Sequence, residues 1–135
     1  MIARAHHARG ILDTNAVIRL GQLDPTMLPD EPLITTVTLA ELTAGPLTAT
    51  SEQERADRQM HLQWAETHFE ALPFDVAAAR SFGLVSAAFR RAGRKPAARS
   101  LDGMIAAIAL AHGLPLYTAN PDDFAHIAGL VVVPI

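Results

Sequence analysis

Short apolar segments typical of β-strands alternate with longer segments of helical periodicity along this chain, and this alternation constrains the fold more than any other feature. The strand-like segments lie at residues 10–12, 32–35, 114–118 and 130–133. Strands that are apolar throughout and separated by helices form parallel sheets covered on both faces. The sequence therefore predicts an α/β fold with a central parallel sheet between two layers of helices.

Three helices are predicted between these strands from periodicity and from helix-end signals. The first spans residues 51–72 and starts with a capping box formed by Ser51 and Glu54. The second spans residues 75–92, and the third spans residues 100–112. The third is apolar on nearly all sides, which predicts that it is buried. The first carries an apolar face made of Leu62, Ala65, Phe69 and Leu72.

Length and composition indicate one globular domain over residues 1–135, with residues 1–9 as an extension of unclear role. Half of the 135 residues are hydrophobic, which argues against disorder. The absence of cysteine excludes disulfides and thiolate metal sites, and it fits a reducing compartment. The longest apolar run, residues 104–111, is far shorter than the roughly 20 residues that span a bilayer. We therefore expect a cytoplasmic protein with no membrane partner and no secretory signal.

Four acidic residues lie among apolar neighbours: Asp13, Glu41, Asp102 and Asp123. A carboxylate in such surroundings is costly unless it is paired, hydrogen-bonded or bound to a cation. Asp13 directly follows a predicted strand and Asp123 follows another closely, and ligands of parallel sheets bind at the carboxyl ends of strands. Oxygen ligands without His or Cys suit Mg²⁺ or Mn²⁺. An ion bound there can ionise water for in-line attack on a phosphoryl group.

Each acid also has a purely structural explanation. Asp13 can cap the helix that follows the first strand, and Thr38 with Glu41 fits the spacing of a capping box. Asp102 lies in a first helical turn, where the helix dipole favours negative charge. The acids after Pro121 can stabilise a helix start in the same way. One such motif is weak evidence, whereas the four in this order form a less common pattern.

Four motifs in this order resemble the successive signatures of the PIN domain, in particular those of the VapC-type toxins of toxin–antitoxin modules. The motifs are ILDTN, TLAEL, LDGMIAAIALAHG and YTANPDDF, and the resemblance covers residues 10–135. It implies a three-layer α/β/α fold and Mg²⁺-dependent cleavage of RNA by water, with Mn²⁺ able to substitute. It also implies a cognate VapB-like antitoxin that enters the active-site groove, and either a homodimer or a heteromeric toxin–antitoxin complex.

The resemblance further implies a role for each acid in catalysis and metal binding. Asp13 and Asp102 correspond to direct metal ligands, and Glu41 to a ligand of the metal or of its water. Asp123 corresponds to the fourth acid of the family, with Asp122 as a less suitable substitute. The polar residues that correspond to supporting positions are Thr14, Thr118 and Asn120.

A basic segment follows the second predicted helix and is expected to bind RNA phosphates. It contains five of the eleven Lys and Arg residues: Arg90, Arg91, Arg94, Lys95 and Arg99. The net charge of −3 argues against a nucleic-acid partner, but this local cluster opposes that conclusion. The alternative is a solvated helix end, since basic residues near a helix C-terminus are favoured by its dipole.

Two other functions compete with the nuclease. A phosphoryl transferase with an aspartyl intermediate would use Asp13. A haloacid-dehalogenase-like phosphatase, however, needs a second Asp two positions later, where this chain has Asn15. A receiver domain needs a Lys just after a late strand, and Lys95 does not lie in such a segment. A catalytically silent RNA- or protein-binding domain is the second alternative, although the presence of all four acids argues against it. Surface, packing or interface roles are expected for Met60, His61, Trp64 and His68.

Overall fold

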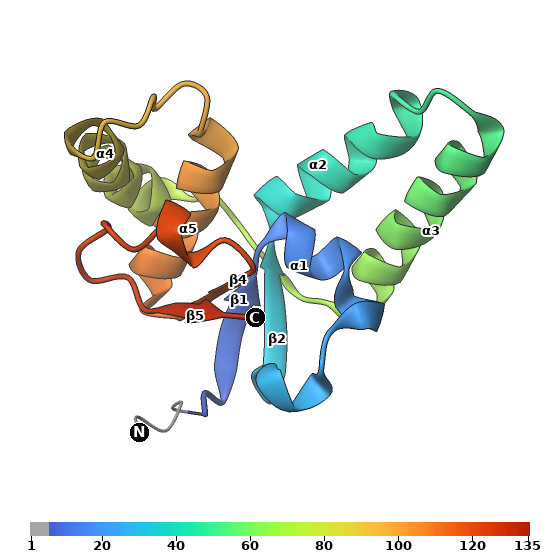
Figure 1. Cartoon of the computed structure of the whole chain (residues 1–135), viewed down its shortest axis with the longest axis horizontal. Helices are drawn as coiled ribbons and strands as arrows, with labels where there is room; N and C mark the ends of the chain where they lie inside the picture. The colour runs from blue at the N-terminus through green and yellow to red at the C-terminus, as the bar shows by residue number, and fades with distance from the viewer. Residues whose placement is uncertain (1–5) are drawn as a thin grey trace.

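The computed structural model describes residues 6–135, and within them the chain forms a five-stranded parallel sheet between two layers of helices (Figure 1). The strands are β1 (Arg9–Leu12), β2 (Glu31–Thr35), β3 (Ala71–Leu72), β4 (Leu116–Thr118) and β5 (Val132–Pro134). The α-helices are α1 (Thr14–Ile18), α2 (Thr36–Leu47), α3 (Glu52–His68), α4 (Val76–Arg91) and α5 (Ser100–His112). The predicted α/β/α architecture is therefore confirmed.

Alternate residues of the central strands supply two separate hydrophobic cores. Successive side chains of a strand point to opposite faces of the sheet, so neighbours in sequence join different layers. One core packs against α4 and α5 and takes Ile11, Leu33 and Leu116 from the sheet. The other packs against α1, α2 and α3 and takes Leu12, Ile34 and Tyr117. This division explains why consecutive residues in the middle of these strands are apolar, since parallel strands are buried on both faces.

The strand order β3-β2-β1-β4-β5 places β1 at the centre of the sheet. Ile11 of β1 is in register with Leu33 of β2 on one side and with Leu116 of β4 on the other. The order of the strands reverses between β1 and β4, and parallel sheets bind ligands beyond the carboxyl ends of strands at such a reversal. The residues that follow β1 and β4 therefore lie where a functional site is expected.

The predicted helix over residues 51–72 is wrong at its end. The α3 helix stops at His68, because Phe69 takes an extended backbone conformation. Leu72 then belongs to β3, in register with Thr35 of β2, rather than to a helix face. The helices predicted over residues 75–92 and 100–112 are confirmed to within a residue at each end. Of the predicted extension, residues 1–5 lie outside the described residues, and Arg9 already belongs to β1.

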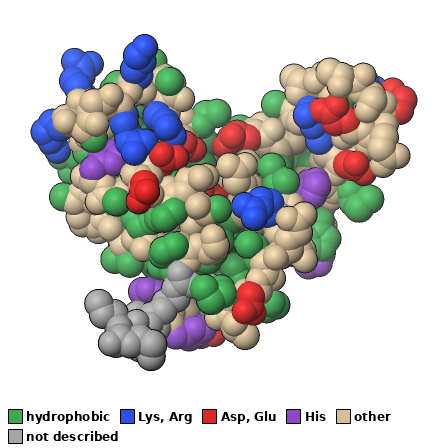
Figure 2. Space-filling view, viewed as in Figure 1, with side chains coloured by type: hydrophobic (Ala, Val, Ile, Leu, Met, Phe, Trp, Pro, Cys, Tyr) green, Lys and Arg blue, Asp and Glu red, His purple; other side chains and the backbone are tan. Residues whose placement is uncertain are grey.

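Two projections flank the carboxyl end of the sheet. The α2–α3 hairpin forms one of them, and α4 and α5, with the segment that joins them, form the other (Figure 1). The surface between them is hollowed in the space-filling view (Figure 2). Within residues 6–135, no helix has the length and apolar character required to cross a membrane.

Candidate active site

Asp13 lies at the junction of β1 and α1 and is only 6% exposed. Its carboxylate accepts a hydrogen bond from the backbone N–H of Ala16 at 2.9 Å, so it caps α1 as one of the two sequence interpretations predicted. Burial raises the pKa of Asp13, while hydrogen bonds from Thr118 and Ala16 oppose the increase. A cap and a catalytic acid are compatible here, because the cap uses one carboxylate oxygen.

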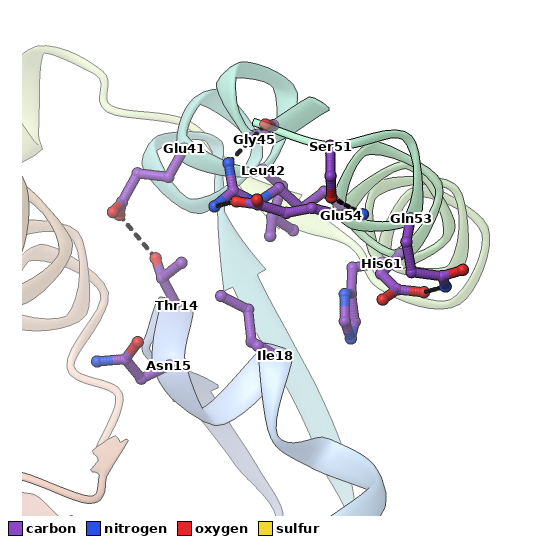
Figure 3. Close-up of a pocket in the computed structure, with 12 residues that line it drawn as sticks. Thr14, Asn15, Ile18, Glu41, Leu42, Gly45, Ser51, Gln53, Glu54 and His61 are labelled. Carbon is purple, nitrogen blue, oxygen red and sulfur yellow. Dashed lines mark hydrogen bonds and ion pairs between the residues drawn. The ribbon is translucent and has the colours of Figure 1, made fainter. Parts of the chain in front are cut away.

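Glu41 lies in the middle of α2, and its capping-box explanation is wrong. The N-cap of α2 is Thr35, whose hydroxyl accepts from the backbone N–H of Thr38 at 3.2 Å. Glu41 instead extends toward α1, where its Oε1 accepts a 2.7 Å hydrogen bond from the Thr14 hydroxyl (Figure 3). A half-buried carboxylate at this point has no role in starting the helix.

The pKa of Glu41 is raised by burial, and the negative charges of Asp102 and Asp13 raise it further, whereas the hydrogen bond from Thr14 lowers it. Glu41 is therefore electrostatically linked to acids on two other elements. Like charges that raise the pKa of one another attract protons or cations to the space between them.

Asp102 lies in the first turn of α5, where the sequence allowed either a dipole role or a catalytic role. The next residue, Gly103, lets α5 lie close to α4, since a Cβ there would be 3.1 Å from the rings of Phe82 and Phe89. Burial raises the pKa of Asp102, as do the charges of Asp13 and Asp123, while Arg99 lowers it. The Asp102 carboxylate is thus coupled to the other acids as well as to the helix start.

Asp123 follows β4 in a short 3-10 helix, Pro121–Asp123, and both of its carboxylate oxygens are engaged by arginines. Arg94 donates to Oδ1 at 2.7 Å and Arg99 donates to Oδ2 at 2.9 Å. Arg94 also donates to the backbone carbonyl of Asp122 at 3.1 Å. Asp123, rather than the exposed Asp122, is the neighbour that raises the pKa of Asp102.

Electrostatic interactions connect the four predicted acids, which we call the acidic centre: Glu41 with Asp13 and Asp102, and Asp102 with Asp13 and Asp123. In residues 6–135, however, no three Asp, Glu or His side chains form a group ready to hold a metal ion. The donor set nevertheless fits a hard cation: all of its ligands are oxygens, and three of its members have raised pKa values that a divalent charge would lower. An ion bound here would draw the carboxylates closer together.

The predicted supporting residues form two hydroxyl contacts with the acids. Thr14 donates to Glu41, and Thr118 hydrogen-bonds to Asp13 while accepting from the backbone N–H of Asn120 at 3.0 Å. The Asn120 side chain is exposed and does not cap the 3-10 helix that follows it, so Asn120 supports the site through its backbone N–H. Sequence reasoning treated Thr38 only as a cap, but its hydroxyl lies 2.9 Å from the Thr14 hydroxyl. The sequence carried one signal for this contact: Thr38 precedes Glu41 by one helical turn, so the two side chains lie on the same face of the helix.

The basic segment divides into two groups. Arg94 and Arg99 are partly buried and form ion pairs with Asp123. The remaining three side chains are exposed: Arg90, Arg91 and Lys95. Basic side chains gather on the α4 side of the hollow in the space-filling view (Figure 2). Two of the five predicted phosphate-binding residues thus pair with an acid of the site, Asp123.

A pocket of about 660 Å³ extends from Thr14 and Glu41 along α3 as far as His61 (Figure 3). A second pocket, of about 450 Å³, is also lined by His61 and continues to Met60 and Trp64. Met60 is 65% exposed and Trp64 is 43% exposed, so these side chains are surface groups rather than core packing. His61 and His68 are exposed, as the sequence predicted.

Comparisons with known proteins agree on one family. The family model described as "PIN domain" matches residues 10–130. Ribonuclease VapC5 of Mycobacterium tuberculosis (strain ATCC 25618 / H37Rv) is 38% identical over 131 residues, which cover 95% of this chain and 94% of that protein.

Solved structures give the same result. The crystal structure of VapBC-5, a member of the VapBC family of toxin–antitoxin systems from Mycobacterium tuberculosis, matches with a TM-score of 0.82 and 36% identity, covering 95% of this chain and 99% of that one. The DNA-bound VapBC structure from Salmonella typhimurium matches with a TM-score of 0.73 and 26% identity, covering 92% and 96%. This chain therefore belongs to the PIN-domain family, and within it to the VapC type.

Proposed function

We propose that this protein is a Mg²⁺-dependent endoribonuclease that hydrolyses RNA phosphodiester bonds with water, and that it acts as the toxin of a toxin–antitoxin pair. Mn²⁺ is expected to replace Mg²⁺, because carboxylates serve both ions. The observation that carries the proposal is the electrostatic coupling of Asp13, Glu41 and Asp102 at the reversal of strand order. The 38% identity to a protein named ribonuclease supports the same activity.

Asp13, Glu41 and Asp102 would hold the divalent ion, and Asp123 would complete the acidic centre. When bound, such an ion supplies a more acidic water and an electrostatic contact for the phosphoryl oxygens. Thr14 keeps Glu41 oriented toward the centre through its 2.7 Å hydrogen bond. Arg94 and Arg99 hold Asp123 in place and offset part of the negative charge that RNA phosphates would meet.

The exposed residues Arg90, Arg91 and Lys95 would contact the RNA backbone at the edge of the hollow. Contacts of this kind give affinity and position the chain, but they carry no choice of sequence. The RNA would then lie with a phosphate over the acids.

A VapB-like antitoxin is the proposed protein partner, supported by the similarity to solved VapBC structures, one of them a member of the VapBC family of toxin–antitoxin systems. The proposed assembly is either a homodimer or a heteromeric toxin–antitoxin complex. A partner that covered the hollow would exclude RNA from the acidic centre and so inhibit cleavage.

The first experiment is cleavage of total cellular RNA by purified protein in Mg²⁺ or Mn²⁺, with EDTA as a control and with the cut ends mapped. Asp13→Asn and Asp102→Asn are the test variants, since Asn keeps a side-chain oxygen for capping and removes the charge. We expect discrete cuts in the wild type that are lost with EDTA and reduced at least about 100-fold in either variant. Full activity of both variants would contradict the proposal.

Exposed Asp24 provides a matched control, because it lies outside the pocket that Glu41 lines. Asp24 caps a short 3-10 helix, Pro25–Met27, by accepting from the backbone N–H of Thr26, and Asn can keep this contact. Asp24→Asn changes the net charge by the same amount as Asp13→Asn and should leave cleavage unchanged. Equal losses in all three variants would show that charge alone, rather than the acidic centre, affects the assay.

A further inference from the structure

Thr38 is a fully buried polar side chain on α2 that the proposed catalytic roles do not use. It precedes Glu41 by three residues, so the two side chains lie on the same face of the helix. The capping of α2 is carried out by Thr35, which accepts from the backbone N–H of Thr38. Capping therefore involves the backbone of Thr38 and does not explain its hydroxyl.

Two threonines in the interior of helices, Thr43 of α2 and Thr67 of α3, bond back to their own helix. The hydroxyl of Thr43 donates to the carbonyl of Leu39 at 2.7 Å, and the hydroxyl of Thr67 donates to the carbonyl of Gln63 at 2.9 Å. This is the usual arrangement for threonine within a helix. Thr38 differs, because its hydroxyl lies 2.9 Å from the hydroxyl of Thr14, across from α2 on α1.

The direction of the hydrogen bonds follows from the number of protons. Thr14 has one hydroxyl proton, and it is donated to the Glu41 carboxylate, which can only accept. The bond between the two hydroxyls must therefore use the proton of Thr38, so that Thr38 donates to Thr14. The result is a chain in one direction, from Thr38 through Thr14 to Glu41.

We propose that Thr38 is a positioning residue for the nuclease reaction: it fixes the Thr14 hydroxyl, which in turn holds the Glu41 carboxylate in the position that binds a divalent ion. This inference rests on the proposed function, because only there is Glu41 a ligand. Hydrogen bonds in a chain strengthen one another, so removal of the first donor weakens the second bond. Groups that orient metal ligands in this way typically contribute 10- to 100-fold to metal affinity or activity.

The test measures Mn²⁺ binding to RNA-free protein by the loss of the free-ion signal in electron paramagnetic resonance. Thr38→Val preserves the shape of the side chain and removes the hydroxyl, and we expect its Mn²⁺ affinity to fall by about 10-fold or more. Thr38→Ser keeps the hydroxyl and should bind Mn²⁺ nearly as the wild type does. In RNA cleavage, kcat should fall for Thr38→Val with KM for RNA unchanged.

Thr43→Val is the matched control, since Thr43 lies on the same helix and its hydroxyl donates to the carbonyl of Leu39 within that helix. It should leave Mn²⁺ affinity unchanged. Melting curves in EDTA establish that each variant is folded, and Thr38→Ala serves as a second variant without a hydroxyl. A double-mutant cycle adds a stricter condition: Thr14→Val combined with Thr38→Val should bind Mn²⁺ no more weakly than Thr14→Val alone.

The outcomes separate this inference from the proposed function. If the wild type binds Mn²⁺ and cleaves RNA while folded Thr38→Val and Thr38→Ala match it, the positioning role is overturned and the nuclease stands. Additive losses in the double mutant would also overturn the relay through Thr14. If the wild type neither binds Mn²⁺ nor cleaves RNA, the proposed function fails and this inference fails with it.

Discussion

The two projections beside the hollow differ in how they are stabilised. In α5, six residues of thirteen are buried, and five of them belong, with residues of α4, to the larger hydrophobic core. In α3, which has seventeen residues, Ala65 is the one buried residue, and it belongs to the smaller core. The α5 helix is thus embedded in its core, whereas α3 packs on its core through one face and exposes most of its surface to water.

Local polar contacts add to the smaller hydrophobic core in stabilising the α2–α3 hairpin. Ser51 caps α3 by accepting from the backbone N–H of Glu54, which itself forms an ion pair with Arg58. Arg58 also donates to the carbonyl of Gly45 at 2.9 Å, and so joins α3 to the end of α2. Contacts of this kind open at lower free energy than a buried core does.

The comparison shows that the acids are held by different elements. Asp102 is attached to the buried α5 and lies 3.7 Å from Arg99, and Asp123 is paired with two arginines. Glu41 belongs to the hairpin and is held by a 2.7 Å hydrogen bond from Thr14. The acids therefore depend on contacts from both projections.

Truncation of one side chain on each projection should give the largest contrast. Ile108 of α5 is 0% exposed, and Ile108→Ala should lower the free energy of unfolding by about 2–5 kcal/mol. Met60 of α3 is 65% exposed, and Met60→Ala should change it by less than about 0.5 kcal/mol. Urea unfolding measures both. Equal losses would show that the two projections are packed alike.

A smaller effect is expected when the polar link of the hairpin is removed. Arg58→Ala breaks the ion pair with Glu54 and leaves the carbonyl of Gly45 without its side-chain donor, which should cost about 1 kcal/mol. Amide hydrogen exchange should speed up in α3 and remain unchanged in α5. Arg55→Ala is the control, since the Arg55 contact with Glu52 is an exposed pair at 3.8 Å. An identical effect of both substitutions would contradict a special role for Arg58.

The sequence predicted the central strands well because each contains consecutive apolar residues, such as Ile11 and Leu12 in β1. It missed β3, which has only two residues, Ala71 and Leu72. The spacing of apolar residues in α3 continues through Phe69 to Leu72, so periodicity alone could not show that the helix ends at His68. Pairing with β2, a tertiary contact, decides the conformation there.

Three of the four predicted acids lie at a strand end or near a helix start, where a carboxylate is conspicuous in the sequence, whereas Glu41 lies in the middle of α2. Their partners could not be predicted. Asp123 pairs with Arg94 and Arg99, which lie 29 and 24 residues away, and Thr38 bonds to Thr14 across 24 residues. Such contacts depend on how β1, β4 and the helices are arranged, and no local pattern encodes that arrangement.

The pH dependence of stability should report the burial of Asp13 in metal-free protein. Its pKa is raised in the folded state above the ordinary value of 3.8. Between pH 3.8 and the raised pKa of the folded state, Asp13 keeps a proton in the folded state that it has lost in the unfolded state. The free energy of unfolding therefore falls as pH rises through this interval, and the contribution of Asp13 is constant above it. Asp13→Asn should remove this cost and be more stable than the wild type above the folded pKa.

Urea midpoints in EDTA across this pH range measure the effect. Asp75→Asn is the control, because Asp75 caps α4 by accepting from the backbone N–H of Ala78 as Asp13 does for α1, yet it is exposed. It should give no gain in stability. A wild type that becomes more stable as pH rises through the interval, with no difference from Asp13→Asn, would contradict the raised pKa.

The smallest effects concern RNA binding, which should depend on one projection alone. In an Asp102→Asn background that binds but does not cleave, Arg90→Gln removes one exposed positive charge beside the hollow. For a single-stranded RNA this should weaken binding by a few fold and reduce the slope of log K against log salt by about 0.7. Arg55→Gln removes the same charge from α3 and should leave the slope unchanged. Fluorescence anisotropy at several salt concentrations separates the two variants. If Arg55→Gln lowered the slope as much as Arg90→Gln does, the RNA backbone would have to contact both projections, and the division between a phosphate-binding side and a hairpin side would be lost.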